Sequence, residues 1–296
     1  MKGSEILSVL LLVIFFGSCA RPLADFVVDD QQRIAPSNIE FKNSSKKADA
    51  YKWDFGDGNI SEEENPVHQY VLSGNYKVIL EAKKGKKTNQ MEKEIHIDAP
   101  KNCKVMIETN FGQMELELYD STPKHRDNFI KLAEEGYFNE LLFHRVIKGF
   151  MVQGGDPESK NAPAGKPLGA GGPGYQVDAE FNPENVHLKG AIAAARMGDG
   201  ANPAKRSSGS QFYIVQGTSV SPELLERMEG QKGIRYTSEQ IKMYQEVGGT
   251  PFLDMEYTVF GRIVKGLEII DQIADVQTAP GDRPTEDVWM RVTVIK

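Results

Sequence analysis

Apolar and polar residues alternate one by one through much of this chain, which is the pattern that half-buried β-strands produce. Between residues 29 and 98 the alternation occurs in four separate runs, with glycine, asparagine and proline clustered between them. Short strands divided by such turn residues are typical of a small β-sandwich. The pattern therefore predicts an all-β domain at 29–98, with strands at 39–41, 50–55, 75–82 and 91–97.

The alternation resumes after a polar, proline-containing linker at about 98–102. Two alternating runs within 104–119 predict a β-hairpin, and Thr122 and Pro123 then have the residue types of a helix start. Gly136 is expected to end that helix. Strand-rich segments continue almost to the end of the chain, so we expect a second, mainly β domain with flanking helices at 103–296.

Two helical patterns interrupt this second domain, at 221–228 and 237–247. In the later one Thr237 and Gln240 match a capping box, in which each residue's side chain bonds the other's backbone N–H. We expect a helical insertion at about 219–249. It either decorates the surface, which we favour, or extends the contacts to a substrate.

The N-terminal 18 residues are predicted to be a targeting segment. Lys2 precedes an apolar run at 6–16, which is too short to cross a bilayer as a mature helix and has the length of a signal-peptide core. The run ends in Gly17-Ser18-Cys19, which resembles a bacterial lipobox. That resemblance implies removal of 1–18, acylation of Cys19 and a tether at 19–28. A plain signal peptide with an incidental cysteine is the alternative.

Composition and charge limit the classes of function that this protein can have. The chain is 40% hydrophobic and 26% charged, as ordinary globular proteins are. Its net charge of −7 argues against a nucleic-acid partner, which calls for a basic surface. The lysines at 83–87 are better explained as a solvated hairpin tip. Acylation of Cys19 would leave Cys103 as the remaining thiol, so no internal disulfide is expected.

Three motifs in the first domain occur at 53–58, 65–70 and 73–76. Together they resemble the PKD domain, an immunoglobulin-like module of extracellular and surface proteins. The aspartates of the first motif suggest calcium, but Asp54 and Asp57 are three apart rather than at alternate positions. We therefore expect turn-forming carboxylates, no metal, and a packed or turn-facing His68. The resemblance implies that the first domain is either a spacer, which we favour, or a surface for protein or glycan contact.

Three blocks in the second domain are FHRVIKGFMVQGGD at 143–156, SGSQFYI at 208–214 and YTVFG at 257–261. In content and order they resemble the cyclophilins, the peptidyl-prolyl cis-trans isomerases. The resemblance implies an eight-stranded β-barrel that accelerates rotation about X–Pro bonds. It implies no cofactor, and proline-containing unfolded or partly folded polypeptides as partners. A peptide-binding or chaperone module without turnover is the alternative.

Arg145 is the catalytic residue that this resemblance implies. Rotation about an X–Pro bond breaks amide resonance, with a barrier of about 20 kcal/mol. In the twisted state the proline nitrogen becomes pyramidal and basic. A fixed donor aimed at that nitrogen stabilises the transition state more than the ground state. An arginine suits this role because its guanidinium stays charged and holds its N–H groups in a rigid fork.

The remaining site residues follow from the same match. Phe150, Met151, Tyr213 and Leu253 would line the proline pocket, and of the adjacent pair Phe150 and Met151 one should pack more deeply. Gln153 would bind substrate backbone and hold Arg145. The other residues expected to contact substrate are His144, Ala195, Arg196, Gln211, Phe252 and Tyr257.

Four positions depart from the common family residues. Phe252 stands where many eukaryotic members have tryptophan, Tyr213 where many have phenylalanine, and Tyr257 where many have histidine. Arg196 replaces a common asparagine, although the backbone near Ala195 and Arg196 is expected to remain open to a peptide. These departures resemble the bacterial version of the site and, with the lipobox resemblance, predict a lipid-anchored protein of the bacterial cell envelope. No acidic cluster follows Cys19, which favours the periplasm over the cell surface.

Other catalytic interpretations are weaker. The glycines at 169–174 have dinucleotide-loop spacing, but a strand-like segment follows them where that motif needs a helix. Ser210 is not flanked as a nucleophile elbow, and no two histidines have zinc-site spacing.

Overall fold

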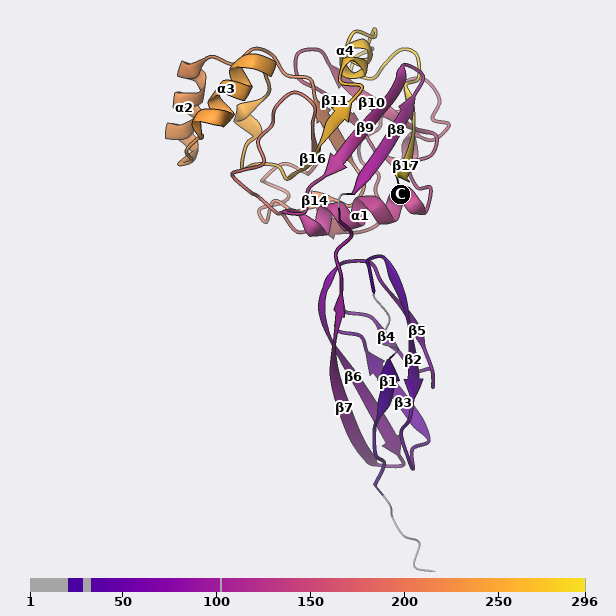
Figure 1. Ribbon diagram of the computed structural model, residues 1–296. Helices are drawn as coiled ribbons and strands as arrows, with labels where there is room; N and C mark the ends of the chain where they lie inside the picture. The colour runs from indigo at the N-terminus through magenta and orange to yellow at the C-terminus, as the bar shows by residue number, and fades with distance from the viewer. Residues whose placement is uncertain (1–20, 29–32, 102, 296) are drawn as a thin grey trace, which may run out of the picture. The chain divides into compact units, whose positions relative to one another are not determined.

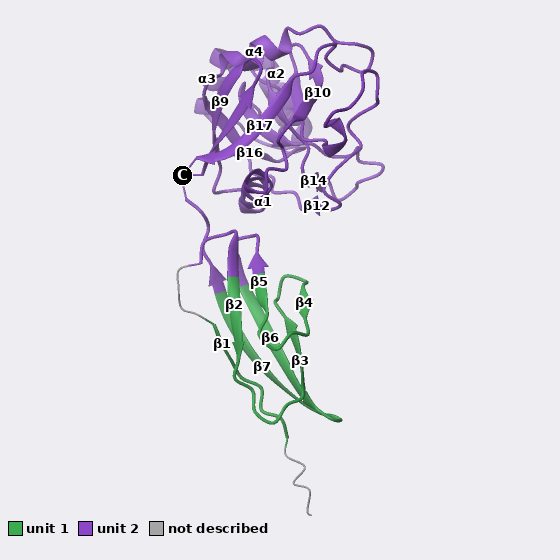
Figure 2. Ribbon diagram, turned by 90° about the vertical axis from the view of Figure 1, so that its right-hand side faces the viewer, with its two compact units in different colours: residues 1–30, 39–68, 76–95 green, residues 31–38, 69–75, 96–296 purple. Residues whose placement is uncertain are grey.

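The computed structural model of this protein describes residues 21–28, 33–101 and 103–295. The chain divides into two compact units (Figure 2). Of the described residues, one unit contains 21–28, 39–68 and 76–95, and the other contains 33–38, 69–75, 96–101 and 103–295. In the described part of the chain, no helix combines the length and the hydropathy needed to cross a membrane. The predicted signal peptide and Cys19 lie outside the described residues.

Strands β1 to β7 form two sheets (Figure 1). The first has the order β1 (Phe26–Val28), β2 (Ser37–Asn43) and β5 (Val67–Tyr70). The second has the order β4 (Ile60–Ser61), β3 (Ala50–Asp54), β6 (Gly74–Lys84) and β7 (Lys87–Ile97). All four strands predicted from the alternation are present, and the mainly β fold class is confirmed.

The core of this sandwich is a cluster of aromatic rings. Trp53 is fully buried, with ring centroids 5.1 Å from Phe26 and 5.5 Å from Phe41. Its indole N–H donates to the carbonyl of Glu63 at 2.9 Å, so the polar end of the side chain is satisfied as well. Tilted and edge-on ring contacts of this kind add to the free energy gained from burial alone.

The predicted tether at 19–28 is wrong for its described part, residues 21–28. Leu23 forms a bridge with Lys46, and Phe26–Val28 is strand β1, paired with β2. Phe26 is completely buried in the aromatic core. Three residues are too few to show a strand period, and the partner strand is distant in sequence, which is why the alternation did not predict β1. The sandwich therefore begins before residue 29.

The aspartates of the first motif form turns. Asp54 Oδ1 accepts from the backbone N–H of Gly56 at 2.9 Å, and Asp57 Oδ1 accepts from that of Asn59 at 3.0 Å. His68 lies with Nε2 2.7 Å from Asp57 Oδ2 and stacks on Phe55 at 4.1 Å between ring centroids. The turn-forming roles and the packed His68 are confirmed. No cluster of three metal-ligating side chains occurs among the described residues.

The second domain is a closed eight-stranded barrel, as predicted. Its strand order is β10-β11-β15-β13-β16-β9-β8-β17, and it closes because β17 pairs with β10. The strands are β8 (Lys104–Thr109), β9 (Gly112–Leu118), β10 (Leu141–Ile147), β11 (Met151–Gly154), β13 (Ala191–Ala194), β15 (Phe212–Val215), β16 (Val259–Lys265) and β17 (Trp289–Ile295). Outside the barrel, β12 (Gln176–Val177) pairs with β14 (Ser207–Ser208).

Helices α1 (Pro123–Glu134) and α4 (Glu268–Ala274) lie at opposite ends of the barrel (Figures 1 and 2). The apolar face of α1 is buried with the barrel core, as its sequence predicts. Thr122 occupies the N-cap position, but its side chain makes no capping bond; its hydroxyl is 3.3 Å from the carbonyl of Tyr119. Cys103 is buried, and burial raises the pKa of its thiol to about 11.

The predicted helical insertion consists of α2 (Pro222–Lys232) and α3 (Ser238–Val247), between β15 and β16. The capping box of Thr237 and Gln240 is present with both of its bonds. The two helices share a small apolar cluster that includes Leu225 and Met228. A short 3-10 helix, η2 (Pro251–Leu253), follows the insertion; another, η1 (Pro157–Ser159), follows β11.

Candidate active site

A β-bulge presents Arg145 to solvent. The pairing of β10 with β11 runs from Phe143 opposite Gly154 directly to Arg145 opposite Gln153, so His144 is an extra residue on β10. A bulge re-aims the side chains around it and occurs often beside active sites. His144 is buried, whereas the Arg145 side chain remains 44% exposed. The alternation of residues alone does not reveal this change of register.

The strand pleat supplies an apolar wall beside Arg145. On β15, Phe212 and Ile214 belong to the barrel core, whereas Tyr213 belongs to a separate cluster on the outer face. Met151 belongs to the same outer cluster and is 2% exposed. The partly buried members of this cluster include Phe150, Leu253 and Tyr257.

Met151 packs more deeply than Phe150, which agrees with the prediction that one of the pair would do so. Strand β11 begins at Met151 and Phe150 lies in the preceding turn, so the two residues do not share a strand. The two side chains therefore need not face opposite ways. Both line the same cavity.

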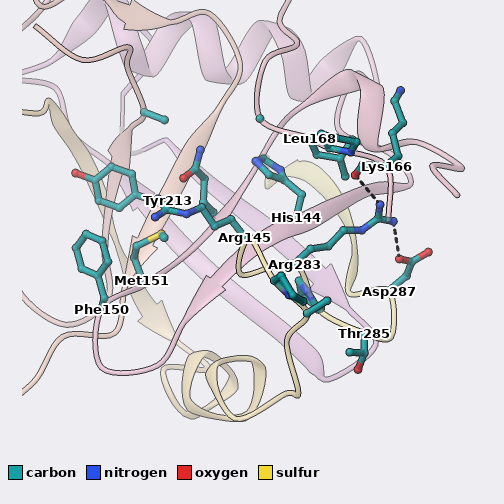
Figure 3. A pocket seen from close by; sticks show the side chains of 18 of the residues that line it. His144, Arg145, Phe150, Met151, Lys166, Leu168, Tyr213, Arg283, Thr285 and Asp287 are labelled. Carbon is teal, nitrogen blue, oxygen red and sulfur yellow. Dashed lines mark hydrogen bonds and ion pairs between the residues drawn. The ribbon is translucent and has the colours of Figure 1, made fainter. Parts of the chain in front are cut away.

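The wall and Arg145 border a cavity of about 860 Å³. Tyr213, Phe150 and Met151 lie on one side of Arg145, and Arg283 and Asp287 lie on the other (Figure 3). Ten of the twelve predicted site residues line it: His144, Arg145, Phe150, Met151, Gln153, Ala195, Arg196, Tyr213, Leu253 and Tyr257. The resemblance thus selected side chains that the fold brings together from five separate parts of the second domain.

The other two predicted residues lie at the margin of this cavity. Gln211 lines a neighbouring cavity of about 660 Å³, which shares Gln153, Ala195 and Arg196 with the first. Phe252 is 50% exposed, and its ring centroid is 5.6 Å from that of Phe150. Both residues therefore border the pocket without forming its floor.

Gln153 does not hold Arg145, contrary to the prediction. Its side-chain amide donates to Gln211 Oε1 at 3.1 Å. Gln211 in turn donates to the carbonyls of Gly169 and Gly171 at 3.0 and 2.7 Å. The two glutamines therefore connect the strands to the glycine-rich loop. That loop is followed by β12 rather than by a helix, which excludes the dinucleotide interpretation.

Asp282 is the partner of Arg145 that sequence reasoning missed. Its Oδ2 accepts from Arg145 Nε at 3.2 Å, and its backbone carbonyl accepts from Val146 N–H at 2.8 Å. Asp282 binds only Nε. The two terminal nitrogens of Arg145 have no hydrogen-bond partner among the described residues. Pro280, Gly281 and Pro284 mark a turn at this position, but they do not indicate which strand the turn will meet.

Arg283 joins two loops that complete the cavity. Its guanidinium donates to the carbonyls of Ala162, Pro163 and Lys166 at 3.1, 2.9 and 3.1 Å. It also lies 3.4 Å from Asp287 Oδ1 (Figure 3). Residues 164–169 and 279–287 border the cavity, and Arg283 fastens one loop to the other. Neither loop was predicted to line the site, because both lie outside the recognised motifs.

His144 lines the cavity and is 4% exposed, and neither ring nitrogen has a hydrogen-bond partner in the structure. Burial lowers the pKa of this histidine, with the carboxylate of Asp156 opposing the shift. Its ring is therefore neutral at neutral pH. A neutral ring agrees with a lining role, in which no proton is transferred.

Arg196 is held within the domain. Its Nε donates to the carbonyl of Glu256 at 2.8 Å, and its guanidinium lies 4.6 Å from the Tyr257 ring centroid. The backbone of Ala195 is also occupied: its N–H donates to the Gln211 carbonyl at 3.0 Å, and its carbonyl accepts from Ser208 N–H at 2.8 Å. The expected opening of the Ala195 backbone to a peptide is therefore wrong.

The paired glycines after Gln153 have a steric cause. A Cβ on Gly155 would lie 2.2 Å from the carbonyl oxygen of Ser210, and the φ angle of Gly155 is 87°. Only glycine combines this backbone conformation with so close an approach. Gly155 thus lets β11 end directly against the segment that carries Ser210 and Gln211.

A closed eight-stranded barrel with an exposed arginine beside an apolar wall is the arrangement that the resemblance to cyclophilins implied. Residues 104–294 match the family described as "Cyclophilin type peptidyl-prolyl cis-trans isomerase/CLD", and residues 19–98 match the PKD domain. The chain therefore belongs to the cyclophilin-type peptidyl-prolyl cis-trans isomerase family. The PKD match begins at residue 19, in agreement with strand β1.

Individual relatives give the same result. A protein of Staphylococcus saprophyticus named as a peptidyl-prolyl cis-trans isomerase is 36% identical over 189 residues, which is 62% of this chain and 87% of the relative. One from Staphylococcus epidermidis is 36% identical over 203 residues, covering 67% of this chain and 93% of the relative. A crystal structure of a Cryptosporidium parvum cyclophilin-type isomerase is 24% identical, with a TM-score of 0.47, over 66% of this chain and 98% of its own.

Proposed function

We propose that this isomerase works on proline-containing polypeptides of the bacterial cell envelope, with Arg145 as its catalytic residue. The observation that carries the assignment is the position of Arg145. Its guanidinium stands 44% exposed beside a cavity whose outer-face wall is apolar. A proline ring against Met151, Tyr213 and Leu253 would bring its amide within reach of the guanidinium.

Arg145 acts by differential binding. Bound proline nitrogen accepts hydrogen bonds poorly while it is conjugated with the carbonyl, and well once the amide has twisted. A guanidinium fixed in place therefore stabilises the twisted state more than either planar state. Acceleration from tens of seconds to milliseconds corresponds to about 7 kcal/mol, and one charged donor supplies about 3 kcal/mol of such a total.

Asp282 orients the catalytic guanidinium. By accepting from Nε at 3.2 Å, it fixes the plane of the fork and leaves the terminal N–H groups toward the cavity. The pair is about half exposed, so it contributes little to the free energy of unfolding. The pair instead orients the Arg145 guanidinium, whose N–H groups must point at one nitrogen of the substrate.

The test is the isomerisation rate of a short X–Pro peptide, measured with the purified full chain and with Arg145→Ala. We expect kcat/KM to fall about a hundredfold, which is the usual cost of one transition-state donor. Arg262→Ala is the matched control, because Arg262 is 54% exposed and pairs with Glu117 on the barrel surface. A wild-type chain that binds the peptide without accelerating it would favour the binding-module alternative.

The sequence before Cys19 supports an envelope protein that is anchored by a lipid at this cysteine. The apolar run at 6–16 and the small residues before Cys19 carry this part of the proposal. In cells fed a labelled fatty acid, the wild-type protein should be labelled and should sediment with membranes. Cys19→Ala should abolish the label, whereas Cys103→Ala should not. An unlabelled wild-type protein released without 1–18 would instead indicate a plain signal peptide.

The PKD domain in this proposal is a spacer between the anchor and the isomerase. Asp54, Asp57 and His68 of its motifs are engaged within the sandwich. Deletion of residues 21–98 should leave peptide isomerisation unchanged and alter only which membrane-associated clients are reached. Loss of binding to a particular protein or glycan upon deletion would assign the domain a recognition role.

A further inference from the structure

The helical insertion surrounds a buried carboxylate next to the proline pocket. Asp254, 2% exposed, immediately follows η2. Its Oδ2 accepts from the hydroxyls of Tyr236 at 2.7 Å and Tyr244 at 2.6 Å. Both tyrosines are buried members of the insertion. A carboxylate this deep requires several donors, and the insertion supplies two of them to one oxygen.

The other oxygen of Asp254 connects to the pocket wall. Asp254 Oδ1 accepts from the backbone N–H of His187 at 2.8 Å and lies 2.7 Å from its Nδ1. With Nδ1 engaged by the Asp254 carboxylate, Nε2 is the ring nitrogen that faces the pocket wall. The Tyr213 hydroxyl lies 3.0 Å from Nε2 and forms a hydrogen bond with it. His187 is completely buried, so this path is closed to solvent.

Tyr213 is the wall residue at the end of this path, and it stands where the family often has phenylalanine. Burial raises its pKa well above the usual value, so the hydroxyl stays protonated and remains a donor. Its ring also meets the Tyr257 ring edge-on at 5.8 Å between centroids. The hydroxyl therefore fixes how the ring is turned, beyond what packing alone would fix.

A second path runs through the backbone. Lys232, the last residue of α2, donates to the carbonyl of Asp254 at 2.9 Å. Thr250 N–H donates to the His187 carbonyl at 2.8 Å. These bonds hold both ends of η2, which carries Leu253 into the cavity and Phe252 to its rim.

We propose that the insertion is a positioning element of the active site: Tyr236 and Tyr244 fix Asp254, and Asp254 fixes the Tyr213 ring through His187 and Leu253 through the backbone. This replaces the surface decoration favoured from the sequence, and it rests on the assignment of Tyr213 and Leu253 to the proline pocket. The insertion thereby sets the affinity for the proline ring. It has no direct part in bond rotation, since none of its side chains lines the cavity.

The proposal predicts an effect on binding rather than on turnover. Tyr213 and Leu253 would contact the proline ring in the ground state and in the twisted state alike, so their displacement weakens both states equally. In the full chain, Tyr244→Phe removes one donor from Asp254 and keeps the ring. We expect KM to rise about threefold to tenfold, with kcat within about twofold of the wild type.

A double-mutant cycle tests the path itself. Tyr213→Phe breaks the connection at the pocket end and introduces the common family residue. In that background, Tyr244→Phe should raise KM by a smaller factor than in the wild type, because only the backbone path to Leu253 remains. Equal effects of Tyr244→Phe in both backgrounds would overturn the proposal. Tyr236→Phe is the second variant, should Tyr244→Phe prove too unstable by thermal unfolding.

Leu225→Val is the matched control within the insertion. Leu225 is 2% exposed in the apolar cluster on α2, and shortening it loosens that packing without removing any donor from Asp254. We expect KM to remain unchanged. A rise in KM equal to that of Tyr244→Phe would show that insertion stability matters rather than the hydrogen-bonded path.

Peptide affinity, measured by calorimetry on the same variants, separates this proposal from the assignment of catalysis. A wild-type chain that binds an X–Pro peptide without isomerising it would contradict the catalytic role of Arg145. The cycle would then be completed with dissociation constants in place of KM. A wild-type chain that neither binds nor isomerises the peptide would overturn both.

Discussion

The polar side chains of the sandwich motifs and those beside the barrel cavity differ in how they are bonded. In the sandwich, Asp57 accepts from Asn59 and lies 2.7 Å from His68, whose ring is stacked on Phe55. In the barrel, Arg145 gives only Nε to Asp282 among the described residues, and His144 has no partner for either ring nitrogen. Polar groups bonded within the fold stabilise it, whereas the exposed terminal nitrogens of Arg145 beside the cavity are available to a substrate.

The difference appears in ionisation as well. Burial acts to raise the pKa of Asp57, but hydrogen bonds from His68 and Asn59 outweigh it and hold the pKa below its usual value. For His144 no comparable partner offsets burial, and its pKa is lowered. The hydrogen bonds around Asp57 thus stabilise its charged form, whereas the ring of His144 stays uncharged beside the cavity. The contrast predicts that substitutions in the sandwich will alter stability and that substitutions at the pocket will alter rates.

The largest expected effect is on the stability of the sandwich. Trp53→Ala empties the centre of the aromatic core and should lower the free energy of unfolding of that domain by about 3–5 kcal/mol. Denaturant unfolding followed by circular dichroism measures it. Peptide isomerisation below the unfolding midpoint should be unchanged. Parallel losses of stability and activity would show that the barrel depends on the sandwich.

Arg145→Lys is next in size. The substitution keeps the positive charge but loses the planar fork, so we expect kcat to fall about tenfold, or about 1.4 kcal/mol. The free energy of unfolding should change by less than about 0.5 kcal/mol, as for most surface substitutions. Arg262→Lys, in the surface pair with Glu117, should change neither quantity. Full activity in Arg145→Lys would mean that charge alone suffices.

Asp282→Asn should have a smaller effect on the same step. It removes the charge that orients Arg145 Nε and keeps the shape of the side chain. We expect kcat to fall about threefold, near 0.6 kcal/mol, with little change in stability because the pair is exposed. An unchanged kcat together with a raised KM would show that the loop at 279–287 shapes the pocket without orienting Arg145.

The smallest effect is a change in the pH dependence of stability. Burial lowers the pKa of His144 in the folded state, so the unfolded chain takes up a proton first as pH falls through about 6.5. His144 therefore contributes a loss of stability below that pH and none above it. His144→Gln should reduce the slope of unfolding free energy against pH between about 7 and 5. An identical slope in both proteins would contradict the burial argument.

Most of the fold could be predicted from local patterns. Alternation revealed the longer sandwich strands and the hairpin of β8 and β9, and the capping box marked the start of α3 at its observed residue. The three recognised motifs contain seven residues that line one cavity, and the wider resemblance to the family added Ala195, Arg196 and Leu253. Strand β1 was missed because three residues carry no usable period. The bulge at His144 was missed because register depends on the partner strand.

What the sequence by itself determined is the class of each domain and the identity of Arg145 and its apolar neighbours, because these depend on residue type and spacing within short segments. Only the tertiary structure decided what those residues touch. Asp282 meets Arg145 across 137 residues of sequence, and Asp254 meets His187 across 67. Such pairings arise from barrel closure and loop packing, which no local pattern encodes, and they decide whether a side chain is held, buried or left open to a substrate.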